Sequence, residues 1–270
     1  VQYYQSVSRV DAGLGHLVKR LKEAGLYDKT LVIVTSDHGM AFPGGKTTVY
    51  EPGLHVPLIV RNPYSQKRGI KNDALVSHVD LTPTMLDFAG GLDAEKNAPQ
   101  KTVNAVAWAK EKGYGRGDNL GPKFTRYHGR SWLGILEQPG DSSRTTIYAS
   151  HTFHEIQMYY PMRVIRDDKY KLIWNIAHPL PYPFASDLWA APSWQAQWKQ
   201  GKDTKYGFRT VDQYIHRPAF ELYDMKYDPD ERTNLASDPA FKATLEDYQA
   251  RLKKFQQDFD DPWVMKWDYE

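Results

Sequence analysis

Hydrophobic residues near the start of the chain recur with the period of a helix. The apolar positions step by three and four residues, as they do on one face of an α-helix: Val7, Val10, Leu14, Leu17 and Leu21. Gly25 fits the C-terminal end of this helix. Residues 31–35 then form a continuous run rich in β-branched residues, which is typical of a strand buried on both faces of a parallel sheet. The pattern therefore predicts a helix followed by a buried strand.

The next apolar segments continue this alternation of helix and strand. Residues 55–60 predict a second strand, and Asp80 is expected to cap a helix that runs from Leu81 to about Ala89. The order helix, strand, loop, strand and helix is typical of an α/β fold. We therefore expect residues 1–90 to form part of an α/β core.

The rest of the chain has a different pattern. Residues 91–128 are polar, rich in Gly and Lys and weakly periodic, so we interpret residues 91–144 as an insertion or linker. Residues 145–270 are expected to form a small antiparallel subdomain that is closed by a terminal helix. Its predicted elements are strands at 146–150, 162–166, 170–174 and 221–224, a hairpin turn at 167–169, a loop-rich region at 178–218 and a helix whose apolar stripe runs from 241 to 255.

Composition narrows the class of protein. Of the 270 residues, 41% are hydrophobic and 25% are charged, which excludes a chain that is disordered throughout. No apolar run approaches the roughly 18–20 residues of a transmembrane helix. The balance of 35 Lys and Arg against 33 Asp and Glu argues against a dedicated nucleic-acid binder. The absence of cysteine excludes disulfides and a cysteine nucleophile within this chain. Because the pattern already predicts a helix at the first residues, we expect this chain to be a fragment or a processed form of a longer protein.

The strongest candidate for chemistry follows the first predicted strand. Asp37 and His38 come directly after residues 31–35, and open α/β sheets bind their ligands at the carboxyl ends of their strands. A carboxylate and an imidazole there are suited to bind a metal ion. An Asp that caps a backbone amide beside a surface His is the more common arrangement, however. The dipeptide alone leaves both interpretations open.

Several motifs, taken in order, resemble the sulfatase family over almost the whole chain. They are Ser36-Asp37-His38-Gly39, Gly45-Lys46, Tyr50-Glu51-Pro52-Gly53, the strand at 55–60, residues 78–84, Gly129-Arg130-Ser131, Glu221-Leu222-Tyr223-Asp224, Asp228-Pro229-x-Glu231 and Asn234-Leu235. Within that family, residues 150–163, 179–184 and 261–264 resemble the heparan N-sulfatase, or sulfamidase, members.

The resemblance implies a fold and a reaction. The fold would be the C-terminal part of an alkaline-phosphatase-like sulfatase sheet, joined to a small antiparallel β subdomain with a closing helix. The reaction would be hydrolysis of sulfate from a sulfated sugar, with the N-sulfate of glucosamine in heparan sulfate or heparin as the expected substrate. Members use a formylglycine made from Cys or Ser in a Cys/Ser-x-Pro-x-Arg motif, and a divalent cation, usually calcium.

The chain departs from the family at the nucleophile. It contains no Cys/Ser-x-Pro-x-Arg motif and no Asp-Asp pair upstream of Asp37. We therefore expect these groups upstream, in an N-terminal portion of the same enzyme that is this chain's partner. The chain alone would then be inactive. The expected substrate is a sulfated glycosaminoglycan, and neither a nucleic acid nor a membrane span is expected.

Site residues carry over from the family one at a time. Asp37 matches a metal-ligand Asp, and His38 lies where many members have Asn, so manganese or zinc is an alternative to calcium. Lys46 matches the cation that contacts the sulfate and is both the catalytic and a substrate-binding candidate. In the segment 150–163 the substrate-binding candidates are His151, His154 and Glu155, although a His–Glu pair there is equally suited to a structural hydrogen bond.

Some residues are assigned away from the site. Arg163 and Arg166 are expected to belong to the scaffold or the rim. Asp167-Asp168 and Asp260-Asp261 are rejected as metal ligands, because they follow the Ser-Asp-His-Gly motif instead of preceding it.

Two other functions and a location remain as expectations. One alternative is a phosphodiesterase or phosphonate hydrolase of the alkaline-phosphatase superfamily, and the other is a non-catalytic relic that binds sulfated glycans. The residues upstream would discriminate among the three. Because the sequence has no Asn-x-Ser/Thr site and no cysteine, and because sulfated glycans are extracellular, we expect a periplasmic or secreted protein.

Overall fold

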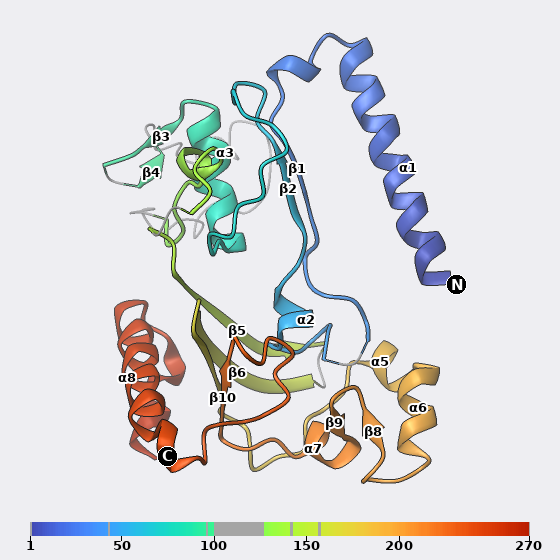
Figure 1. Cartoon of the computed structure of the whole chain (residues 1–270), viewed down its shortest axis with the longest axis vertical. Coiled ribbons are helices and arrows are strands. Elements are labelled where there is room, and N and C mark those ends of the chain that lie inside the picture. The colour runs from blue at the N-terminus through green and yellow to red at the C-terminus, as the bar shows by residue number, and fades with distance from the viewer. Residues whose placement is uncertain are drawn as a thin grey trace, which may run out of the picture. The chain divides into compact units, whose positions relative to one another are not determined.

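The computed structural model describes residues 2–42, 44–95, 97–99, 127–140, 143–155 and 158–269. Their contacts divide the chain into two units. Figure 1 labels the helices and strands of the chain. The first unit comprises Val1–Val34 and Ile59–Ser143, and the second comprises Thr35–Leu58 and Arg144–Glu270. The predicted insertion at 91–144 falls largely on residues outside the described ranges, so the three-part division of the chain stays a prediction.

The first unit contains the predicted helix and both predicted strands. Its elements are α1 (Gln2–Glu23), β1 (Val32–Thr35), β2 (Leu58–Arg61), α3 (Leu81–Phe88), β3 (Leu92–Asp93), β4 (Ala98–Pro99) and the short 3-10 turns η1 (Tyr27–Lys29), η2 (His78–Asp80) and η4 (Leu133–Ile135). α1 ends at Glu23, and Gly25, the predicted stop, follows with a φ of 67°. The amides of Gly25 and Leu26 satisfy the last carbonyl groups of the helix.

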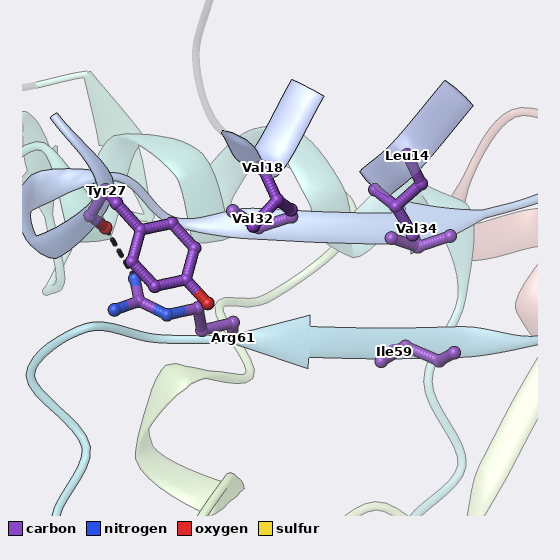
Figure 2. Close-up of a pocket in the computed structure, with 7 residues that line it drawn as sticks. All are labelled: Leu14, Val18, Tyr27, Val32, Val34, Ile59 and Arg61. Carbon is purple, nitrogen blue, oxygen red and sulfur yellow. Dashed lines mark hydrogen bonds between the residues drawn. The ribbon is translucent and has the colours of Figure 1, made fainter. Parts of the chain in front are cut away.

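One face of α1 lies over β1. Leu14 and Val18 of the helix, with Val32 and Val34 of β1 and Ile59 of β2, line a cavity of about 150 Å³ (Figure 2). No residue of α1 is buried, and β1 is half-buried to exposed along its length. The prediction that residues 31–35 are buried on both faces is therefore wrong. Within the described ranges, β1 pairs with β2 and has one side of α1 over it, and this cover leaves the strand partly exposed.

Two further predictions in this region are corrected. The second strand begins at Leu58 and not at residue 55, because Glu51–Leu54 forms a helical turn, α2, that ends at His55. Asp80 does not cap α3 with its side chain. It accepts hydrogen bonds from the amide of Ser77 at 3.0 Å and from the amide of Arg130 at 2.7 Å, so it fixes the start of η2 and the Gly129-Arg130 motif instead.

The second unit is built on a four-stranded antiparallel sheet with the order β10-β7-β6-β5. Its strands confirm the predicted ones and extend them: β5 (Thr146–His154), β6 (Met158–Asp167), β7 (Tyr170–Asn175) and β10 (Phe220–Asp224). The hairpin between β6 and β7 pairs Arg166 with Lys171. The carboxylate of Asp167 accepts the amides of Lys169 and Tyr170 at 3.0 and 3.1 Å, which closes the predicted turn.

Both faces of this sheet are covered, so neighbouring residues of a strand belong to different core clusters. Val164 and Ile173 pack on one face, and Ile165 and Leu172 pack on the other. The closing helix α8 (Lys242–Asp258) covers the second face with Tyr248 and Leu252, as its predicted stripe requires.

The first face is covered by the region that was predicted to be loop-rich. Loops make up much of residues 178–218, as predicted, but the prediction missed short elements whose apolar side chains, such as Leu188, Trp194 and Tyr214, enter the core. The elements are α5 (Ser186–Ala190), α6 (Pro192–Trp198), β8 (Lys205–Tyr206), β9 (Arg209–Thr210) and α7 (Val211–Ile215). Outside this region, two 3-10 turns flank α8, namely η5 (Pro239–Phe241) and η6 (Pro262–Asp268). Along the described ranges, no helix is both long and apolar enough to cross a bilayer.

Candidate functional site

The residues after β1 form a tight polar turn. The hydroxyl of Ser36 donates to the carbonyl of His38 at 2.8 Å, and the amide of His38 donates to Oδ1 of Asp37 at 3.0 Å. The Asp37 side chain is 82% exposed. The hydrogen bond from the amide of His38, followed by the charge of its imidazole, lowers the pKa of Asp37. The carboxylate is thus ionised at neutral pH and open to a ligand.

The imidazole of His38 is fixed in one tautomer. Nδ1 lies 2.8 Å from the carbonyl oxygen of Gly39, and because a carbonyl can only accept, Nδ1 carries the proton. In the neutral ring the lone pair is then on Nε2, which lies 3.5 Å from Oδ2 of Asp37. That separation is compatible with two atoms that bind one cation at about 2.0–2.5 Å each. A backbone carbonyl behind a ligating imidazole is also a usual arrangement in metal sites.

These two donors do not complete a metal site by themselves. Within the described ranges, no group of three or more His, Cys, Asp or Glu side chains is gathered so that it could hold a metal ion. Asp37 and His38 therefore supply two donor atoms, and the predicted metal site stays a prediction.

Glycines allow close backbone contacts in the loop between Asp37 and Lys46. The amide of Gly39 donates to the carbonyl of Gly53 at 3.0 Å, and a Cβ on Gly39 would lie 1.7 Å from the carbonyl oxygen of Pro52. A Cβ on Gly45 would lie 2.0 Å from the carbonyl oxygen of Met40, and the amide of Lys46 donates to that same oxygen at 2.8 Å. Only glycine permits these approaches, which explains why the separate motifs occur together.

Buried charges anchor the other end of this loop. Glu51 accepts an ion pair from Lys171 at 3.1 Å, and its amide donates to the carboxylate of Glu231 at 2.7 Å. Burial opposes the ionisation of Glu51, but Lys171 and Arg166 outweigh burial and lower its pKa. Lys171 is fully buried and also lies 2.7 Å from Glu231. Glu51 thus has a structural role, although it belongs to a family motif.

Lys46 is paired with an acid that the sequence analysis missed. Its Nζ lies 2.5 Å from Oδ2 of Asp187 on α5, and its side chain is only 17% exposed. The hydrogen bond from Lys46 lowers the pKa of Asp187. The only sequence feature near Asp187 is the Pro-rich stretch 179–184 that precedes it, and that stretch does not indicate a partner for Lys46.

The segment 150–163 brings His154 and Glu155 to the end of β5. Glu155 has a φ of 56°, and its carboxylate accepts the amide and the hydroxyl of Ser186 at 3.2 and 2.9 Å. Nε2 of His154 lies 3.9 Å from that carboxylate. Consecutive residues of α5, Ser186 and Asp187, therefore contact Glu155 and Lys46. Residues 156 and 157 of the segment lie outside the described ranges.

His151 lies deeper than the other two candidates. Its Nδ1 is 3.0 Å from the carbonyl oxygen of Tyr160, so this nitrogen carries the proton, and Nε2 is buried with no hydrogen-bond partner among the described residues. Burial lowers the pKa of His151. The ring is therefore neutral at neutral pH, with a lone pair available to a donor.

The residues assigned away from the site have structural partners. Arg163 forms an ion pair with Asp261 at 2.5 Å, and Arg166 lies 3.5 Å from Glu51. Asp167 accepts the hydroxyl of Tyr248 at 2.6 Å and closes the β6–β7 turn. Asp167 and Asp261 thus connect the sheet to α8 and to the segment that follows it.

The chain is similar to known proteins in sequence and in structure. The family model described as Sulfatase matches residues 2–92. The human N-sulphoglucosamine sulphohydrolase is 35% identical to this chain over 265 residues. The alignment covers 97% of this chain and 48% of that protein. The chain thus spans about half the length of this curated relative.

Two solved structures show the same fold. One is a complex with the substrate D-glucosamine-2-N,6-O-disulfate, with a TM-score of 0.60 and 22% identity over 94% of this chain and 40% of the other. The other is the phosphonate monoester hydrolase of Agrobacterium radiobacter, with a TM-score of 0.59 and 20% identity over 95% of this chain and 40% of the other. Residues 2–92 of this chain thus belong to the sulfatase family, and the similarity to the human relative extends over almost all of the chain.

Proposed function

We propose that this chain is the C-terminal part of a sulfatase that removes sulfate from a sulfated sugar, and that its substrate is the N-sulfate of glucosamine in heparan sulfate or heparin. One observation carries the proposal: the 35% identity to the human N-sulphoglucosamine sulphohydrolase extends over 97% of the chain, far beyond the 91 residues of the family model. It therefore includes the segment 150–163, which supplies His154 and Glu155.

Asp37 and His38 are proposed as two ligands of a divalent cation. Calcium is the first choice, and the imidazole leaves manganese or zinc as alternatives. A bound cation would neutralise sulfate oxygens as charge develops on them. Asp37 contributes an exposed anionic oxygen, and His38 contributes Nε2, whose lone pair is fixed by the hydrogen bond of Nδ1 to Gly39. The remaining ligands and the formylglycine are proposed to belong to the N-terminal portion of the same enzyme.

Lys46 is proposed to bind the sulfate directly. Its ammonium group carries three N–H donors, of which Asp187 occupies one. The other two can donate to sulfate oxygens and stabilise their charge in the transition state. Lys46 thus acts in substrate binding and in catalysis.

We propose that the sugar is bound and discriminated by His151, His154 and Glu155. Sulfamates and sulfate esters present the same terminal oxygens to Lys46, so discrimination between them must come from groups that contact the ring and its substituents. A buried polar group left unpaired by the wrong substrate costs about 1–3 kcal/mol, or roughly ten- to hundredfold in kcat/KM. The carboxylate of Glu155 is suited to accept a sugar hydroxyl or the N–H of a sulfamate.

Kinetics of the full-length protein test this proposal. N-sulfated glucosamine should have a higher kcat/KM than 6-O-sulfated glucosamine. His154→Ala should lower kcat/KM for the N-sulfated sugar roughly ten- to hundredfold and leave a small aryl sulfate within about threefold. His216→Ala is the control, because His216 is an exposed histidine 3.0 Å from Asp212 in the same unit, and it should change neither value.

Two outcomes would contradict the proposal. Equal losses on the sugar and the aryl sulfate would make His154 a scaffold residue. A clear preference for the 6-O-sulfated sugar would leave the sulfatase family in place and overturn the N-sulfate. We also propose that the protein is periplasmic or secreted, which fractionation of the source cells would test.

A further inference from the structure

The ammonium group of Lys46 is held by an acid from a distant part of the chain. Its Nζ lies 2.5 Å from Oδ2 of Asp187, and the lysine side chain is 17% exposed. The second carboxylate oxygen of Asp187, Oδ1, accepts the amide of Leu188 at 2.8 Å. Both oxygens of Asp187 therefore have partners, so the carboxylate has a defined orientation. It fixes the orientation of the Lys46 ammonium group as well.

Ser186, the residue before Asp187, contacts Glu155, which is proposed to bind the sugar. Ser186 donates its amide and its hydroxyl to the carboxylate of Glu155, which has left-handed backbone geometry at the end of β5. The first turn of α5 thus contacts Lys46 from one motif and Glu155 from another. The nearby His154 adds to the electrostatic stabilisation of the Asp187 carboxylate.

A carboxylate in this position is costly for anion binding. Asp187 is ionised at neutral pH, because the hydrogen bond from Lys46 lowers its pKa, and its negative charge opposes the approach of a sulfate group. Ground-state affinity for the anion therefore does not account for an acid beside this lysine. Orientation does, because a fixed ammonium group directs its two remaining donors, whereas a free lysine side chain samples many rotamers.

Stability does not account for the pair either. The Asp187 side chain is 48% exposed, and ion pairs with an exposed member contribute little to the free energy of folding. A misplacement of a catalytic group by about 1 Å, in contrast, can cost roughly 100-fold in rate.

We propose that Asp187 is a positioning residue that aims the ammonium group of Lys46 at the sulfate, and that it favours the transition state at the expense of ground-state affinity. This inference rests on the proposed role of Lys46 in binding sulfate. It adds a residue that no motif indicates, and it makes the first turn of α5 the link between the sulfate-binding and the sugar-binding sides of the site.

The test separates affinity from turnover in the full-length protein. Asp187→Asn should lower kcat on a small aryl sulfate by roughly 10- to 100-fold, while the dissociation constant of inorganic sulfate, measured by calorimetry, stays within about threefold or decreases. Asp187→Glu keeps the charge but moves it by one methylene group, so its kcat should be intermediate. Asp212→Asn is the matched control, because Asp212 is a half-exposed acid in the first turn of α7 with its own partner, His216, and it should leave both values unchanged.

A double-mutant cycle shows whether Asp187 acts through Lys46. In the Lys46→Ala background, Asp187→Asn should change kcat and the sulfate dissociation constant by less than about twofold. An unchanged kcat in the single variant, a parallel loss of sulfate affinity, or the same loss of kcat in both backgrounds would each overturn the inference.

The failure of the proposed substrate would be seen separately. If the wild-type protein hydrolyses the aryl sulfate but does not prefer N-sulfated glucosamine, the proposed N-sulfate is wrong and the cycle still decides the role of Asp187. If it hydrolyses neither, the proposed function fails, and the cycle is then measured on the dissociation constant of inorganic sulfate. There, a decrease of this constant caused by Asp187→Asn only when Lys46 is present supports the pairing. An increase, no change, or equal changes in both backgrounds overturn it.

Discussion

Hydrogen bonds within a single turn orient the side chains of Asp37 and His38. The amide of His38 stabilises the Asp37 carboxylate, and the carbonyl of Gly39 fixes the proton on Nδ1 of His38. Both side chains thus have a defined orientation, with 3.5 Å between Oδ2 and Nε2. This orientation depends on four consecutive residues, so a local motif is sufficient to specify it.

Asp37→Asn tests this pair in the full-length protein. The substitution keeps the shape of the side chain but removes the charge that favours a hard cation, so kcat/KM should fall at least about 100-fold, with loss of bound metal measured by elemental analysis. Because the side chain is 82% exposed, the melting temperature should shift little. Unchanged turnover with unchanged metal content would remove Asp37 from the site.

At the scale of elements, buried charges join α2 to the sheet. Lys171 on β7 is fully buried between Glu51 of α2 and Glu231, at 3.1 and 2.7 Å. The site loop between β1 and β2 is therefore anchored at α2 by ionic contacts to the sheet of its own unit. Any change in this cluster should act on the fold before it acts on the chemistry.

Lys171→Met tests the anchor. The substitution leaves two buried carboxylates without their shared cation, which should lower the free energy of unfolding by about 3–5 kcal/mol. Urea denaturation measures the loss. Lys242→Met is the control, because Lys242 is an exposed lysine on α8 and its removal should cost less than about 0.5 kcal/mol. A loss below about 1 kcal/mol in Lys171→Met would show that Arg166 suffices to neutralise Glu51.

The attachment of α8 should depend on pH. Burial opposes the ionisation of Asp167, but its hydrogen bonds from Tyr248, backbone amides and Arg251 outweigh burial and lower its pKa. Since the folded pKa lies below the unfolded value of about 3.9, the stabilisation is complete above that value and is lost as the pH falls through the folded pKa.

Urea denaturation at pH 6.5 and at pH 3.5 measures this dependence. The free energy of unfolding should be lower at pH 3.5, and Asp167→Asn should reduce the difference between the two values, because asparagine does not titrate. If the variant and the wild-type protein lost the same free energy between the two pH values, groups other than Asp167 would carry the effect.

At the scale of the whole molecule, α1 and its cavity leave apolar surface open to solvent. Val7, Val10 and Leu17 are each more than half exposed, and Leu14 and Val18 line the cavity over β1 (Figure 2). A surface of this kind is typical of an interface or of an aggregation-prone chain. We therefore expect these 270 residues, expressed by themselves, to associate or aggregate in sedimentation experiments.

The same preparation should hydrolyse neither an aryl sulfate nor N-sulfated glucosamine, because the chain has no Cys/Ser-x-Pro-x-Arg motif to supply a nucleophile. A monodisperse monomer that unfolds cooperatively would contradict the expected association. Turnover by the pure chain, at a rate that follows its concentration, would contradict the expected inactivity.

Local patterns were sufficient for the elements whose partners lie close in the sequence. The stripe of α8, the β6–β7 hairpin and its Asp167 turn follow from periodicity and turn chemistry, which depend on a few neighbouring residues. The turn that orients Asp37 and His38 is local as well, while their role as ligands stays a prediction. The order of the motifs was sufficient to predict the family that residues 2–92 match.

Tertiary structure decided the features that join distant segments. Periodicity says which face of a strand is apolar but not what covers it, so β1 was expected to be buried and is half-buried. The short helices α5 to α7 have too few residues for a clear stripe and are held by packing on the sheet. Asp187 escaped the sequence analysis because its contact with Lys46 spans 141 positions, and no local pattern encodes a contact that exists only once the chain has folded.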